Sequence, residues 1–195
     1  MTSVGRTGQS TPGATAGARP AGVAWSTARW AGVALFALVS DAATKAWALS
    51  ALGRGHQIAV PGGIIRLQLV ANHGAAFGIG SGHETVVAVV SLALIVALGV
   101  WAARASTAAE RIGAWLAVGG GLGNLLDRVI RPPGGLHGAV TDWIHLSFYG
   151  PTFNLADVWL RGGLLIAVAG WLWHRRRRPV GPAGGRELTN ETDDD

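Results

Sequence analysis

Two aspartates near the C-terminal end of the chain lie among apolar and aromatic residues, where carboxylates are rare. Asp142 occurs in the sequence AVTDWI, and Asp157 occurs in NLADVWL, where it opens an apolar run. Burial of an unpaired carboxylate is costly, so a sequence places one there only with a reason. Two carboxylates held close together share one proton, and such a pair can activate water for attack on a carbonyl carbon, as in aspartic proteases. Asp142 and Asp157 are therefore the candidate catalytic residues.

Each of these residues also has a structural interpretation. Asp157 could be the N-cap of the apolar helix that follows it, a role that Asp fills well. Asp142 could be a loop acid that accepts hydrogen bonds from backbone amides. Asn154 could orient one of the carboxylates or cap the same helix. The residue types alone leave both interpretations open.

Further polar residues lie in or beside apolar segments. Asp41 and Lys45 are four positions apart, so on a helix they share a face and can form an ion pair that lowers the cost of placing both in a bilayer. The adjacent Asp127 and Arg128 predict an ion pair or an interfacial anchor, with a structural role favoured over a catalytic one. Asn124, one turn before Arg128, can hydrogen-bond across helices.

The sequence NHGAAFG at positions 72–78 predicts a turn. Its small residues would also let an extended substrate backbone approach closely. No metal or other cofactor is expected, because the six His are scattered and form no metal-binding set with the acids. The chain has no Cys, which excludes disulfides, thiolate catalysis and Cys-ligated zinc.

Four apolar segments are long enough to cross a bilayer as helices, at residues 30–52, 85–103, 108–126 and 156–173. Between the first two, residues 64–70 have strand character and are bounded by Pro/Gly-rich and Asn/Gly-containing turns. Residues 129–153 are interpreted as a loop that carries Asp142. The predicted fold is an all-α membrane protein with four transmembrane helices and a small extracytoplasmic β element.

The charge distribution predicts the domain limits and the orientation. Residues 1–28 are expected to form a disordered cytoplasmic tail, residues 29–174 the membrane domain, and residues 175–195 a basic then acidic cytoplasmic tail. Arg residues concentrate at 104, 111 and 175–178, which places both termini in the cytoplasm and both candidate acids on the outer side. The net charge of +5 forms no basic face interleaved with aromatics, so no nucleic-acid partner is expected.

Five blocks of the sequence resemble those of the bacterial lipoprotein signal peptidases (signal peptidase II), in the same order. They are DAATK at 41–45, NHGAAFG at 72–78, GGGLGNLLDR at 119–128, GAVTDWI at 138–144 and FNLAD at 153–157. Each block alone is a weak signal, but five in order over four apolar segments are a strong one. The resemblance covers residues 29–173.

The resemblance implies an aspartic endopeptidase of the bacterial cytoplasmic membrane. Such an enzyme cuts the signal peptide from diacylglyceryl-modified prolipoproteins just before the lipidated Cys, so its partners are these substrates and membrane lipids, with no obligate protein partner. It maps the catalytic pair onto Asp142 and Asp157, leaves Asp127 outside the pair, and places Thr141 where the family usually has an apolar residue. The supporting or substrate-contacting residues are then Asp41, Lys45, Asn72, Gly74, Ala75, Phe77, Asn124, Arg128 and Asn154.

Two other functional classes fit the composition. A small proton-coupled transporter or channel could use Asp41, Lys45, Asp142 and Asp157 as a relay. A scaffold could use its polar residues only to hold helices together. Acids near the outer ends of the spans favour a protease, whereas acids deep in a span favour a relay, and only Asp41 and Lys45 are expected to lie deep.

Overall fold

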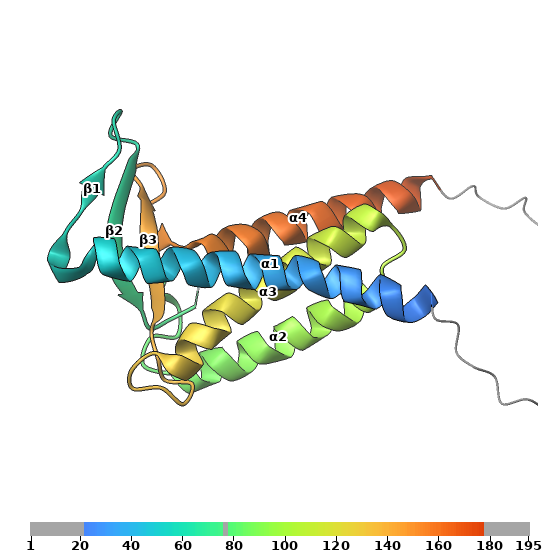
Figure 1. The fold of residues 1–195 in the computed structure, drawn as a ribbon, viewed down its shortest axis with the longest axis horizontal. Helices are drawn as coiled ribbons and strands as arrows, with labels where there is room; N and C mark the ends of the chain where they lie inside the picture. The colour runs from blue at the N-terminus through green and yellow to red at the C-terminus, as the bar shows by residue number, and fades with distance from the viewer. Residues whose placement is uncertain (1–21, 76–77, 178–195) are drawn as a thin grey trace, which may run out of the picture.

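The computed structural model describes residues 22–75 and 78–177 of the chain, and this part is mostly helical. Four long helices lie side by side: α1 (Gly22–Ala51), α2 (Glu84–Arg104), α3 (Ala108–Ile130) and α4 (Leu155–Arg176). A small sheet lies at one end of these helices, and both ends of the described chain lie at the other end (Figure 1). The four predicted apolar segments are confirmed as helices.

The sheet is antiparallel, with the strand order β1-β2-β3-β4. Its strands are β1 (Ile58–Ala59), β2 (Ile65–Asn72), β3 (Val140–Leu146) and β4 (Thr152–Phe153), and a short 3-10 helix, η1 (Gly53–Gly55), follows α1. The strand predicted at 64–70 is confirmed as β2. The interpretation of residues 129–153 as a loop is wrong, because β3 and β4 lie within them and Asp142 is on β3 opposite Val70.

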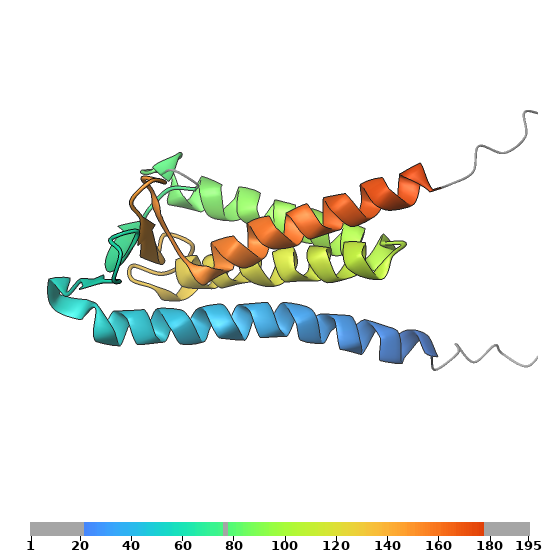
Figure 2. The ribbon, with the colours of Figure 1, turned by 90° about the horizontal axis from the view of Figure 1, so that it is seen from above.

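The central helix is α3, which contacts each of the other three helices. Its glycines allow these close approaches. A Cβ on Gly119 would meet the backbone of Ala34 in α1, and a Cβ on Gly120 would meet the backbone of Ala156 in α4. Small residues at such positions let the backbones of membrane helices approach closely. Figure 2 shows α1 along one side of the bundle formed by the other helices.

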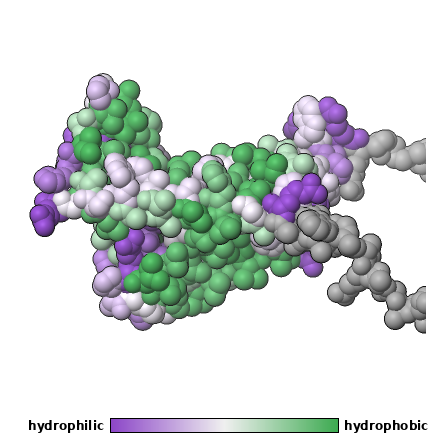
Figure 3. Space-filling view, in the orientation of Figure 1, coloured by the Kyte–Doolittle hydropathy of each residue, from purple (hydrophilic) through white to green (hydrophobic). Residues whose placement is uncertain are grey.

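Three helical segments of the described chain are long and apolar enough to cross a membrane: Arg29–Ala51, Glu84–Arg104 and Leu155–Arg176. The fourth helix, α3, does not meet this criterion of apolarity, since it carries Glu110, Arg111, Asp127 and Arg128 and is rich in Gly. A helix enclosed by its neighbours needs little apolar surface of its own. On the face seen in Figure 3, apolar side chains make up most of the helical body, while hydrophilic ones gather at its two ends.

The helix limits differ from the predicted ones at a few positions. Helix α1 begins at Gly22, so residues 22–28, which the sequence analysis assigned to a disordered tail, are helical. Helix α3 continues to Ile130, beyond the predicted end at 126. The remaining residues of the two predicted tails, 1–21 and 178–195, lie outside the described residues.

Candidate active site

The two candidate acids meet at the end of the bundle that carries the sheet. Asp142 is on β3, and Asp157 is in the first turn of α4. Both line a cavity of about 600 Å³ that continues between α2 and α4 along apolar side chains: Val87, Leu94, Ile95, Leu98, Leu160 and Leu164. The site therefore has a polar end, formed by the two acids and their amide partners, and a long apolar extension.

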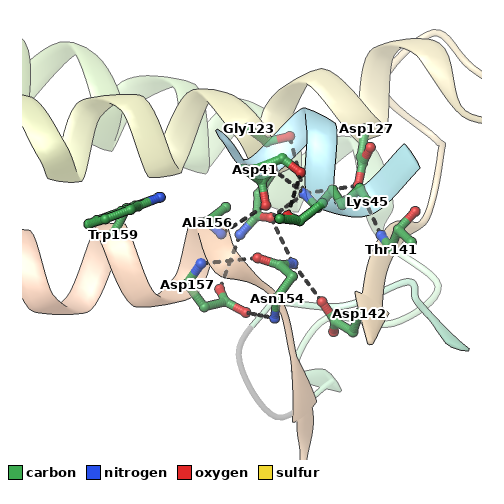
Figure 4. A network of polar contacts seen from close by, with 12 residues as sticks. Asp41, Lys45, Gly123, Asp127, Thr141, Asp142, Asn154, Ala156, Asp157 and Trp159 are labelled. Atoms are coloured by element: carbon green, nitrogen blue, oxygen red, sulfur yellow. Dashed lines mark hydrogen bonds and ion pairs between the residues drawn. The ribbon is translucent and has the colours of Figure 1, made fainter. Parts of the chain in front are cut away.

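Asn154 holds the two acids together. It is the N-cap of α4, where its Oδ1 accepts a hydrogen bond from the Asp157 backbone N–H at 3.0 Å and the Asp157 Oδ2 accepts one from the Asn154 backbone N–H at 3.3 Å. This reciprocal pair is a capping box. The Asn154 Nδ2 also donates to the Asp142 Oδ1 at 2.6 Å (Figure 4). Asn154 thus fills both of its predicted roles, and Asp157 is the third residue of the helix and not its N-cap.

Asp142 is almost completely buried, with 2% of its surface exposed. Its second oxygen, Oδ2, accepts a hydrogen bond from the Asn72 Nδ2 at 2.9 Å. Burial raises the pKa of Asp142 to about 7, and the negative charge of Asp157 adds to this rise, while hydrogen bonds from the two Asn side chains oppose it. A carboxyl group with this pKa holds its proton in a large share of molecules near neutral pH.

Asp157 has a different environment. It is only half-buried, and its Oδ1 accepts a hydrogen bond from the Asn124 Nδ2 at 3.1 Å. Its place in the first turn of α4 puts it at the positive end of the helix dipole, where a negative charge is stabilised. The two carboxyl groups of this cavity therefore differ in their surroundings, since Asp142 is buried on β3 and Asp157 is half-buried at the start of α4.

Lys45 joins α1 to this site from the interior of the bundle. Its side chain is 1% exposed, and its Nζ lies 2.7 Å from the Asp41 Oδ2 and 3.0 Å from the Asp127 Oδ2. It also donates to the Asn124 Oδ1 at 3.0 Å, and the Asp41 Oδ1 accepts a hydrogen bond from the Ala156 backbone N–H at 2.8 Å. The predicted pair of Asp41 and Lys45 is confirmed, and it is part of a larger buried cluster (Figure 4).

The predicted ion pair between Asp127 and Arg128 is wrong. Asp127 pairs with Lys45 and with the Nε of Arg131 at 3.1 Å, and it accepts a hydrogen bond from the Thr141 backbone N–H at 2.9 Å. Arg128 donates to the backbone oxygens of Gly74 and Gly138. Adjacent residues on a helix do not face each other, so the two side chains serve different neighbours.

Residues 33–173, more than half of the chain, match the family model described as Signal peptidase (SPase) II. This chain belongs to the signal peptidase II family. Relatives of this family include the lipoprotein signal peptidase of Bifidobacterium longum subsp. infantis, which is 40% identical over 128 residues that make up 66% of this chain and 69% of that protein. The lipoprotein signal peptidase of Mycobacterium tuberculosis is 32% identical over 136 residues, 70% of this chain and 67% of that protein.

Two solved structures share the fold. One is a bacterial membrane enzyme solved by the in meso method at 2.3 Å, with a TM-score of 0.67 and 24% identity, covering 80% of this chain and 95% of that chain. The other, a bacterial membrane enzyme solved by the same method at 1.9 Å, has a TM-score of 0.63 and 26% identity, covering 74% and 93%. The apolar helices of this family member and the membrane enzymes that share its fold indicate a membrane protein. The transporter, channel and scaffold hypotheses gain no support.

Most of the predicted site residues of this signal peptidase II family member come together. Those that line the cavity are Asn72, Gly74, Ala75, Asn124, Arg128, Asp142 and Asp157. Asn154, Asp41 and Lys45 lie directly behind them, while Phe77 lies outside the described residues. Among the described residues, no cluster of three or more His, Asp or Glu side chains could hold a metal ion.

Among the cavity residues that the sequence analysis did not single out are Tyr149 and Arg161. The Arg161 Nη1 donates a hydrogen bond to the Tyr149 hydroxyl at 2.9 Å. A signal for Arg161 was present, since a cation four residues after Asp157 inside an apolar segment is unusual. Tyr149 gave no such signal, because it comes to the cavity through the turn between β3 and β4.

Proposed function

We propose that this protein is an aspartic endopeptidase that removes the signal peptide from diacylglyceryl-modified bacterial prolipoproteins, cutting just before the lipidated Cys. Asp142 and Asp157 are its catalytic pair. The observation that carries this proposal is the Asn154 bridge, which holds two carboxyl groups from β3 and α4 at the polar end of an apolar cavity. Membership of the signal peptidase II family and relatives named lipoprotein signal peptidase support the substrate class.

The environments of the two acids divide their roles. Asp157, at the positive end of α4, is the ionised member. It takes a proton from a water molecule while the oxygen of that water attacks the scissile carbonyl carbon. Asp142, whose pKa is raised to about 7, is the protonated member and donates to the carbonyl oxygen. The tetrahedral intermediate then collapses: the proton on Asp157 passes to the leaving amine as the C–N bond breaks, and a hydroxyl proton returns to Asp142. No covalent intermediate is needed.

The apolar extension of the cavity suits a substrate that arrives from the lipid. Side chains of α2 and α4, among them Leu94, Leu98 and Leu164, line its walls and could pack against a signal-peptide helix. The diacylglyceryl chains would stay in the bilayer and fix the position of the cut. Lateral entry of this kind avoids transfer of an apolar helix through water.

We further propose that α3 crosses the membrane as well, so that the protein has four spans. Successive helices run in opposite directions, and both described ends lie away from the sheet (Figure 1). The end away from the sheet carries Arg104, Arg111 and Arg175 to Arg177, which favours the cytoplasmic side. The catalytic pair then faces the outer side of the bacterial cytoplasmic membrane.

The test is to incubate the purified protein with a diacylglyceryl-modified prolipoprotein and to measure release of the signal peptide. Cleavage is expected directly before the lipidated Cys. The same prolipoprotein without the diacylglyceryl group is the control, and it should be cut poorly or not at all. Equal cleavage of both forms would remove the lipid from recognition and leave a general signal peptidase.

A further inference from the structure

Arg161 occupies an unusual place in the cavity wall. On α4, the residues that line the cavity are Asp157, Leu160, Arg161 and Leu164, whose spacing of three and four marks one face of the helix. Arg161 lies four residues after Asp157, about 6 Å further along the helix axis toward the membrane interior. It is thus a cation on the substrate-facing side of an apolar span, next to the proposed reaction centre.

The fold itself makes little use of this side chain. Arg161 is exposed, and among the described residues no carboxylate forms an ion pair with it. Its Nη1 donates to the hydroxyl of Tyr149, whose ring packs edge-on against Phe153 at a centroid distance of 5.9 Å. The guanidinium has five N–H donors in a fixed plane, so this one contact fixes its direction and leaves other donors for a ligand.

We propose that Arg161, oriented by Tyr149, donates hydrogen bonds to the ester carbonyl oxygens of the diacylglyceryl group on the substrate Cys. This inference rests on the proposed function. The lipid is attached to the residue directly after the scissile bond, so its two ester carbonyl carbons are joined to the carbonyl that the acids attack by chains of about eight and nine covalent bonds. Ester carbonyls are acceptors without a donor of their own, and the guanidinium is a donor only.

Apolar side chains around Arg161 suit the acyl chains of the diacylglyceryl group. Leu160 and Leu164 flank it on α4 and, across the cavity, Leu94 lies on α2. Acyl chains could pack on these side chains while the esters stay level with the guanidinium. Arg161 is therefore a specificity-determining residue, which anchors the lipid part of the substrate and takes no part in proton transfer.

The test uses two synthetic prolipoproteins that differ only in the lipid linkage, one with two ester-linked chains and one with two ether-linked chains. An ether has no carbonyl oxygen, so wild-type protein should show a KM about tenfold higher for the ether substrate. In Arg161→Gln, the KM for the ester substrate should rise about tenfold, with little change in kcat, and the preference for ester over ether should disappear. Tyr149→Phe should raise the KM for the ester substrate by less, because it removes the hydrogen bond that orients the guanidinium but keeps the guanidinium itself.

Arg66→Gln is the matched control, because Arg66 is exposed on β2 and does not line the cavity. It should leave both KM values unchanged. Equal KM values for the two substrates in wild-type protein would overturn the inference, as would an undiminished ester preference in Arg161→Gln. A failure of wild-type protein to cut either substrate would instead refute the proposed function. The wild-type comparison needs no variant, so it remains decisive if Arg161→Gln folds poorly.

Discussion

Asn154 lies at the centre of the proposed mechanism because its amide and backbone contact both acids. Its Nδ2 donates to Asp142, and its backbone N–H donates to Asp157. The Asn154 Oδ1 accepts from the Asp157 backbone, so the amide has one orientation that satisfies every partner. The Asn124 Oδ1 accepts from both Lys45 and Asn154, which leaves its Nδ2 to face Asp157. The geometry of the pair is thus set by amide side chains.

Replacement of either proposed catalytic acid by Asn would distinguish a catalytic role of that residue from a structural one. Asp142→Asn and Asp157→Asn keep the shape of each side chain but remove the titratable proton. Each should lower kcat by about a thousandfold or more, because acid and base act as one unit. The melting temperature should stay near the wild-type value. Substantial cleavage by either well-folded variant would contradict the assignment. Arg66→Gln, at an exposed position of β2 outside the cavity, serves as the active control.

The raised pKa of Asp142 predicts a pH dependence of activity. The proposed acid must hold its proton in the free enzyme, so kcat/KM should fall as the pH rises through about 7. The measurement is a pH profile of kcat/KM with a single substrate. A profile that stays flat from pH 6 to pH 9 would contradict the role of Asp142 as the proton donor.

The raised pKa of Asp142 also predicts how the stability of the folded protein depends on pH. The pKa of Asp142 is raised from 3.8 to about 7 in the folded protein, so between these values the folded state binds more protons than the unfolded state. Stability should therefore decrease as the pH rises across this window. Asp142→Asn, which has no proton to lose, should melt with a weaker pH dependence than wild type. Equal pH dependence in the two proteins would count against the raised pKa.

At the scale of the elements, the sequence predicted the helices well and the sheet in part. Apolar segments near the length of a bilayer are a strong signal, and the alternation in β2 was visible. The strand β3 was missed because its identity depends on pairing with β2, some seventy residues earlier. The Pro and Gly residues before it favoured a loop, and no local pattern reveals a partner so far along the chain.

Side-chain partners were harder to predict than elements. The pairing of Asp41 with Lys45 follows from helical spacing alone. The contacts of Asp127 with Lys45 and Thr141 depend on how α1, α3 and β3 pack, so sequence neighbours were a poor guide to them. The same holds for Arg161 and Tyr149, which approach each other only because α4 starts directly after β4.

Substitutions in the buried cluster between α1 and α3 should lower the stability of the protein by different amounts. Lys45→Met would leave Asp41 buried without its cation and Asp127 with Arg131 alone, and it should destabilise the protein by about 3–5 kcal/mol. Asp127→Asn leaves Lys45 paired with Asp41 and should cost less, with cleavage retained by the folded protein. Melting temperatures of both variants and activity per folded molecule test this. Loss of cleavage in well-folded Asp127→Asn would move a catalytic role to the end of α3.

At the scale of the whole molecule, the packing of α3 bears on how the chain crosses the membrane. Among the four long helices it is the one that is not apolar enough to be recognised as a membrane span by composition, yet it contacts all the others and carries Asn124 and Arg128 into the site. Enclosure by three helices explains how a helix with buried Gly and charged residues can lie at membrane depth, because its polar groups bond to protein and do not face lipid.

Reporter fusions test whether α3 crosses the membrane. Truncations fused after Arg104 or Arg177 should place the reporter in the cytoplasm, because the Arg residues at that end retain it there. Fusions after Arg66 or Pro133 should place it outside. The decisive comparison is between Arg104 and Pro133, which lie on either side of α3. Opposite locations would confirm the crossing, and a cytoplasmic reporter after Pro133 would put β3 and Asp142 on the wrong side of the membrane for the proposed function.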